Sequence, residues 1–170
     1  MILVESDVSE EWDSRRDWPG LADRAAQAAV GASAYAGLIA SAADFEISVR
    51  FTSDEEVRAL NAQWRAKDKP TNVLSFPMIE PDLIAAIAKA GDGEALLGDI
   101  VVAHGVCARE AAEKGVSVET HAAHLIVHGT LHLLGYDHET NDDDADAMEA
   151  TERRALAAIG ISDPYLIEEV

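Results

Sequence analysis

Two segments of the chain have the hydrophobic patterns of β-strands. Residues 45–51, FEISVRF, alternate apolar and polar side chains, which predicts a strand with one buried face. Residues 96–103, LLGDIVVA, form a nearly continuous apolar run, which is typical of a central strand covered on both faces. Shorter strands are predicted over residues 2–4 and 71–77, and the polar residues 5–19 are expected to form a loop.

Helical periodicity accounts for much of the remaining chain. Ser53 and Glu56 form a capping box, and the apolar spacing after it predicts a helix over residues 54–65. Gly115 is expected to end a helix that begins at residue 104, because glycine favours the left-handed turn at helix ends. Further helices are predicted over residues 21–35 and 142–159, and residues 78–93 are expected to form a surface excursion with a short helical stretch.

The most apolar helix is predicted between an N-cap at Ser117 and Leu134. Apolar residues lie on every side of it, which indicates a helix buried in the middle of the fold. Helices and short strands interleave without the regular alternation of a doubly wound fold. The sequence therefore predicts a single domain over residues 1–170, of the α+β class, in which a small mixed β-sheet packs around a buried central helix.

Histidines are concentrated at the end of this helix. His128 and His132 lie four residues apart, so on a helix they share one face, about 6 Å apart along the axis. Gly135 favours the left-handed turn that ends a helix, and a chain that turns back there can bring His138 to face the other two. Three imidazoles that leave one position open are typical of a catalytic zinc site. We therefore expect His128, His132 and His138 to bind one Zn²⁺.

Other interpretations of these residues stay open. His124 lies on the same stripe, so His124, His128 and His132 form an alternative ligand set, with a poorer angular spread because one helix supplies all three. Ordinary hydrogen-bonded histidines are the remaining alternative, which the spacing of three such residues disfavours. The sequence assigns no role to His121, and Asp99 is expected either to hydrogen-bond locally or to orient a ligand histidine.

The histidine spacing is also that of zinc proteases in which a glutamate follows the first histidine. Here that residue is Gly129, so the general base of the protease reaction is missing. This absence argues against a peptidase. It does not argue against hydrolysis, because zinc alone can lower the pKa of a bound water to about 7.

Charge restricts the surfaces that can bind nucleic acid. The chain has 13 Lys and Arg against 32 Asp and Glu, a formal net charge of −19, which counts against a broad nucleic-acid interface. One basic cluster, formed by Arg65, Lys67 and Lys69, stands out, and RNA is expected to bind there if it binds at all. The acidic run 139–146 is expected to place negative charge at the start of the next helix rather than to bind a hard cation.

Cysteine content and hydropathy indicate a cytoplasmic protein. The chain has one cysteine, Cys107, which excludes an internal disulfide and is expected to be a small buried thiol in a reducing compartment. No apolar run approaches the roughly 18 residues of a membrane span. The first residues, MILVESDVSEEWDS, lack the basic-then-apolar pattern of a signal peptide.

Three blocks of sequence form a specific combination. They are LNAQWRAKDKPTNVLSFP at residues 60–77, LLGDIVV at 96–102 and HLIVHGTLHLLGYDH at 124–138, followed by NDDDADAMEATE and the tail Asp163-Pro164-Tyr165. Together they resemble the YbeY family of bacterial rRNA-maturation endoribonucleases. The resemblance implies an α+β fold around the histidine helix, a functionally important arginine at Arg65, and metal ligands at His128, His132 and His138. Asn72 stands where many members have aspartate, which preserves hydrogen bonding but not the role of a base.

The resemblance also implies an activity. It implies a metal-dependent endoribonuclease specific for single-stranded RNA that acts in 16S rRNA 3′-end maturation and ribosome quality control. The expected partners are the ribosome, ribosomal proteins and an assembly GTPase. Neither membrane association nor DNA binding is expected. Arg65 and His128 are the expected catalytic residues, and Arg65, Lys67 and Lys69 are expected to bind phosphates. Either water or the RNA 2′-hydroxyl is the attacking group. The alternatives are a peptidase-like metallohydrolase and a zinc-containing ribosome assembly factor without catalytic activity.

Overall fold

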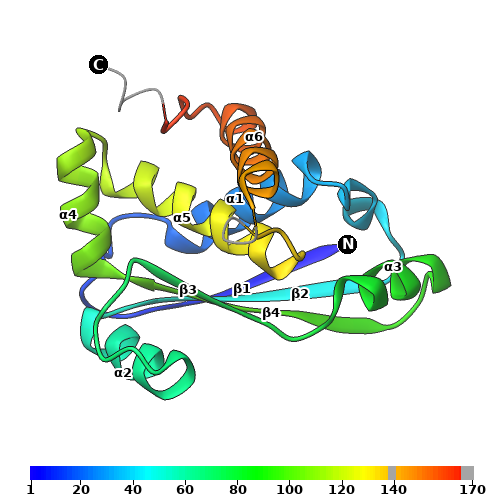
Figure 1. Ribbon diagram of the computed structural model, residues 1–170, viewed down its shortest axis with the longest axis horizontal. Helices are drawn as coiled ribbons and strands as arrows, with labels where there is room; N and C mark the ends of the chain where they lie inside the picture. Colours follow the sequence, from blue (N-terminus) through cyan, green and yellow to red (C-terminus); the bar gives the residue numbers. More distant parts are fainter. Residues whose placement is uncertain (138–140, 166–170) are drawn as a thin grey trace.

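A four-stranded sheet with the order β1-β2-β4-β3 forms the base of the fold. The computed structural model describes residues 1–137 and 141–165 (Figure 1). Strands β1 (Ile2–Val8), β2 (Asp44–Thr52) and β4 (Glu94–Ala103) run parallel, and β3 (Val73–Pro77) pairs antiparallel with β4. The predicted mixed sheet is therefore confirmed, with the apolar run 96–103 in a central strand.

Six α-helices and one short 3₁₀ helix are described in addition to the sheet. They are α1 (Trp18–Ala32), the 3₁₀ helix η1 (Ala36–Ala40), α2 (Asp54–Arg65), α3 (Pro81–Ala90), α4 (His104–Lys114), α5 (Val118–Leu133) and α6 (Asp142–Ala158). The prediction of a loop over residues 5–19 was wrong at both ends. Strand β1 continues to Val8 because it pairs with β2 as far as Phe51, and α1 begins at Trp18 because the Asp17 carboxylate caps it.

Helix α5 is the buried central helix that its hydrophobicity predicts. It packs against β3 and β4 on one side and against α1, α4 and α6 on the others (Figure 1). Apolar side chains on all sides of the helix, such as Leu125, Ile126 and Leu131, are buried. Helix α2 covers the opposite face of the sheet, where Val57, Leu74, Val101 and Ala103 form a smaller core.

The chain reverses direction at Gly135, as predicted. Gly135 has a φ of 97°, and the amide of Tyr136 donates to the Leu131 carbonyl at 3.0 Å, which ends α5. The following turn places Tyr136 and Asp137 beside the histidine face of α5. His138 lies outside the described residues.

Two further local expectations, the placement of acidic charge at the start of α6 and the burial of Cys107, agree with the structure. Asn141 caps α6 by accepting from the amide of Asp144, so Asp142, Asp143 and Asp144 of the acidic run lie in the first turn of that helix, where its dipole favours negative charge. Cys107 is buried, and burial raises the pKa of its thiol to about 12. No helix within residues 1–137 and 141–165 is long and apolar enough to cross a membrane.

The turn at Gly135 provides a test of the fold. A Cβ there would lie 2.6 Å from Cγ of Pro81, in addition to the cost of the left-handed backbone, which is about 1–2 kcal/mol for a non-glycine residue. We expect Gly135→Ala to lower the free energy of unfolding by about 2 kcal/mol or more in urea denaturation. Gly115→Ala is the matched control, because Gly115 also has a positive φ but has open space around it. An equal loss in both variants would show that Pro81 imposes no constraint.

Candidate active site

The predicted catalytic and binding residues line one cavity of about 820 Å³. Arg65, the last residue of α2, and Lys67 and Lys69, which follow it, line the cavity from one side, and we call residues 65–70 the basic loop. Helix α5 contributes His128 and His132. The remaining lining comes from β3 and its preceding loop and from the turn after α5, and includes Asn61, Asn72, Ser75, Tyr136 and Asp137. The structure thus brings together residues more than 60 positions apart in the sequence.

Buried Asn61 holds the basic loop in place. Its side-chain amide donates to the Lys69 carbonyl at 2.8 Å, and its own carbonyl accepts from the Lys67 amide at 3.2 Å. Ala66, which lies between Arg65 and Lys67, adopts a left-handed conformation with a φ of 56°, and α2 ends directly before it. The sharp turn directs the basic loop along the cavity rather than away from it.

The only acidic residue of the basic loop is neutralised outside the cavity. Asp68 accepts a two-point hydrogen bond from Arg58, at 2.8 and 3.2 Å, and this guanidinium lowers the pKa of the Asp68 carboxyl. Arg65, Lys67 and Lys69 form no ion pair with any residue in the described part of the chain. Their charge is therefore available to an anionic ligand.

The two histidines of α5 point their ring nitrogens at each other. Nε2 of His132 lies 3.1 Å from Nε2 of His128, and the two rings are steeply inclined to each other. Nδ1 of His128 lies 2.6 Å from Oε1 of Glu152, a residue of α6 that is 1% exposed. Because the Glu152 carboxylate accepts a hydrogen bond from Nδ1–H of His128, the lone pair of this ring lies on Nε2, the nitrogen that faces His132.

Glu152 connects three side chains behind the cavity. Its second carboxylate oxygen accepts from Nε2 of His124 at 3.1 Å and from the hydroxyl of Tyr165. Burial by itself raises the pKa of Glu152, but the hydrogen bonds from His124, His128 and Tyr165 outweigh it and hold the pKa well below its ordinary value. The carboxylate is thus ionised at neutral pH and holds His128 in one tautomer.

Sequence reasoning missed Glu152, although the pattern of α6 contained a sign of it. Met148 and Leu156, four residues to either side, are buried on the inward face of the helix. A glutamate in the middle of an apolar stripe has to be paired, because an isolated buried carboxylate is very costly. The partners of Glu152 were not visible in the sequence, because they come from α5 and the C-terminal segment.

The alternative ligand set does not assemble. His124 is buried, bonds to Glu152 and does not line the cavity of His128 and His132. His121 is also buried, with Nε2 at 2.8 Å from Glu110, and burial lowers its pKa. The proposed ligand-orienting role of Asp99 does not hold either, because Asp99 lines a groove on the opposite face of the sheet. Glu152 contacts His128 instead.

Gly129 faces the sheet and not the cavity. A Cβ at this position would lie 3.1 Å from Cγ2 of Ile100, so α5 packs closely on β4 here and even a Cβ would fit tightly. A glutamate there would be forced against the sheet and would not reach the histidines. The packing therefore agrees with the sequence argument against a protease.

Asn72 has the hydrogen-bonding role expected of it. Its side-chain amide donates to Glu110 at 3.0 Å, and its side-chain oxygen accepts from the Val73 amide at 2.7 Å. Glu110 in turn pairs with His121 of α5. Asn72 thereby ties the start of β3 to the helices beside it.

The geometry of His128 and His132 fits a zinc site. In a tetrahedral site with Zn–N bonds of about 2.0–2.1 Å, two ligand nitrogens lie about 3.3 Å apart, close to the 3.1 Å between the two Nε2 atoms. Nδ1 of His128 is hydrogen-bonded to the Glu152 carboxylate, and zinc-bound histidines usually donate their second ring N–H to such a group. Within residues 1–137 and 141–165 no group of three ligating side chains could hold a metal ion, and His138 lies outside that range.

Comparison with known proteins identifies the family. The family model described as "Endoribonuclease YbeY" matches residues 17–160. The chain belongs to the endoribonuclease YbeY family. The YbeY protein of Rhizorhabdus wittichii is 56% identical over 169 residues and 99% of both chains, and that of Novosphingobium aromaticivorans is 51% identical over 170 residues and 98% of both.

A solved structure supports the same fold. The chain is similar to the solution structure of TM1509 from Thermotoga maritima, with a TM-score of 0.53 and 23% identity, over 94% of this chain and 91% of that one. At this level of identity the similarity concerns the fold alone. It agrees with the α+β arrangement expected of a YbeY family member.

Removal of the Glu152 carboxylate tests the buried network. Glu152→Ala leaves His124, His128 and Tyr165 without their acceptor, and we expect a loss of about 3 kcal/mol in the free energy of unfolding. Urea denaturation with chelator present measures the loss without a contribution from bound metal. Glu149→Ala is the control, since Glu149 is on the same helix, is partly exposed and forms an ion pair with Arg153. A loss no larger than that of the control would show that the network does not stabilise the fold.

Proposed function

We propose that this protein is a metal-dependent endoribonuclease that cleaves single-stranded RNA in the cavity between α5 and the basic loop. The proposal rests on one observation, which is that the phosphate-binding and metal-binding candidates line the same cavity. In a chain with a net charge of −19, Arg65, Lys67 and Lys69, which have no ion-pair partner among residues 1–137 and 141–165, lie in the same cavity as the His128–His132 pair. A phosphate bound by the cations would lie beside the ligand nitrogens.

The residues of the cavity divide into two groups by their chemistry. His128 and His132, together with His138, would hold one Zn²⁺, which when bound supplies a Lewis acid for a phosphoryl oxygen and lowers the pKa of a water. Arg65 would bind the scissile phosphate through two parallel N–H···O bonds and offset the charge that develops on it. Lys67 and Lys69 would contact neighbouring phosphates, which makes binding salt-dependent.

The charge distribution favours a single strand over a duplex. A duplex carries twice the charge per unit length, and its second strand would lie against a surface that is acidic outside the basic loop. A single strand needs only the local cluster. The same argument disfavours double-stranded DNA as a substrate.

We infer that the substrate is ribosomal RNA, with the 3′ end of 16S rRNA as the cleavage site and ribosome quality control as the wider role. Three cations give weak affinity for free RNA, so a ribosome-bound partner would have to bring the strand to the cavity. A ribosomal protein or an assembly GTPase would serve, and a cytoplasmic location follows from such partners. A zinc-containing assembly factor without catalytic activity is the second candidate, and the variants below separate the two.

Arg65→Ala tests the proposed reaction directly. We expect cleavage of a labelled single-stranded RNA to fall at least about 100-fold, because a transition-state charge contact is worth roughly 3 kcal/mol, while metal content stays at the wild-type level. Gel assays give the rate and elemental analysis gives the metal. Arg109→Ala is the control, because Arg109 is exposed, pairs with Asp54 and does not line the cavity. Full activity in Arg65→Ala would remove Arg65 from the mechanism.

His132→Ala distinguishes a catalytic metal from a structural one. The α5 helix is buried by apolar contacts on all sides, so we expect the variant to keep its circular dichroism spectrum and a cooperative unfolding transition. Metal content should fall well below the wild-type value of about one per chain, and RNA cleavage should be lost, as it should be in wild type treated with chelator. Unfolding of the variant, with no cleavage by the metal-loaded wild type, would favour the assembly factor instead.

A further inference from the structure

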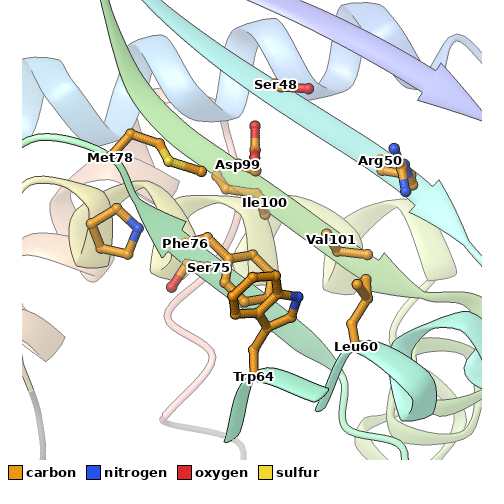
Figure 2. A pocket seen from close by; sticks show the side chains of 11 residues that line it. Ser48, Arg50, Leu60, Trp64, Ser75, Phe76, Met78, Asp99, Ile100 and Val101 are labelled. Atoms are coloured by element: carbon orange, nitrogen blue, oxygen red, sulfur yellow. The ribbon is translucent and has the colours of Figure 1, made fainter. Parts of the chain in front are cut away.

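A second cavity of about 450 Å³ lies on the other face of the sheet, below the C-terminal end of α2. We call it the α2 groove. Its walls are apolar and include Leu60 and Trp64 from α2, Phe76 from β3 and Val101 from β4, whereas Ser48 of β2 and Asp99 of β4 contribute polar groups (Figure 2). Apolar walls with a few convergent polar groups are typical of sites for small planar ligands.

The α2 groove adjoins the active-site cavity. Ser75 and Pro77 line both, and they belong to β3, which is the edge strand of the sheet. On α2, the consecutive residues Trp64 and Arg65 line the groove and the cavity respectively. A chain that crosses the sheet edge beside α2 can therefore occupy both at once.

We propose that the α2 groove binds an unpaired nucleobase, preferably guanine, of the RNA strand whose phosphate lies at Arg65. This proposal rests on the proposed endoribonuclease function and adds a specificity site to it. The base would stack on Trp64 and present its hydrogen-bonding edge to Asp99. A base that is paired in a duplex cannot enter, so the groove would add to single-strand preference.

Trp64 has the properties of a stacking platform. Its side chain projects from α2 over the groove and is 65% exposed, which is a high fraction for so large an apolar residue (Figure 2). Trp12 and Trp18, by contrast, are almost fully buried in the core. Exposed aromatic rings beside a cationic site are the usual means by which proteins hold single-stranded nucleic acid.

Asp99 supplies the acceptor that selects the base. Its carboxylate points into the groove, and it forms no hydrogen bond with a side chain or backbone group elsewhere in the described chain (Figure 2). Guanine presents two donors side by side, the ring N1–H and the N2 amino group, which match the two oxygens of a carboxylate. Arg50, at the same groove, is held by Glu56 at 2.8 Å and balances part of the local negative charge.

Binding measurements with matched oligonucleotides test the proposal. The probes are 2′-O-methyl, uridine-rich single strands that carry one guanosine or one inosine, since inosine lacks only the N2 amino group. We expect the metal-loaded wild type to bind the guanosine strand roughly tenfold more tightly by fluorescence anisotropy. Trp64→Ala should weaken binding of both strands about tenfold, and Trp64→Phe should retain most of the affinity. Asp99→Asn should remove the preference for guanosine.

Two controls separate the groove from general surface effects. Leu83→Ala removes an exposed apolar side chain of α3, and Asp92→Asn removes an exposed carboxylate. Neither residue lines the groove. Both should bind like wild type. If Trp64→Ala and Asp99→Asn also bind like wild type, the proposal is wrong. If the wild type cleaves no RNA in the assay above, the endoribonuclease proposal fails, whereas cleavage without guanosine preference overturns the nucleobase site alone.

Discussion

The burial of α5 on all sides is the constraint on which the rest of the structure depends. The helix contacts the sheet with one face and three other helices with the remainder, so its rotation and position are fixed by packing. Gly129 allows the close approach to β4, and Gly135 allows the chain to turn back at the end. His128 and His132 are therefore held in one orientation before any ligand binds, as a catalytic site requires.

The same burial explains the charge behind the site. Buried histidines need hydrogen-bond partners, and Glu152 of α6 accepts from Nε2 of His124 and from Nδ1 of His128. The cost of burying the carboxylate is offset by the bonds it accepts, and the Arg153–Asp163 ion pair holds the segment that carries Tyr165 beside it. The C-terminal segment is thus coupled to the orientation of His128.

The edge strand β3 lies between the two candidate RNA-binding regions. Because β3 is the edge strand of the sheet, its residues Ser75 and Pro77 border both the active-site cavity and the α2 groove. Helix α2 ends at this edge, so its last turn supplies an aromatic residue to the groove and an arginine to the cavity. An acidic protein can in this way concentrate its contacts with an RNA strand in one small region.

The sequence alone determined most of the elements, the buried helix, the histidine pair and the basic loop, because these depend on periodicity and spacing among neighbouring residues. Helices α2 and α4 begin and end where the pattern predicts. Only the tertiary structure decided that Arg65 lies with His128, that Glu152 and not Asp99 contacts that histidine, and that Asp99 faces a separate groove. Those pairings join residues far apart in the chain, and they follow from how whole elements pack, which no local pattern encodes.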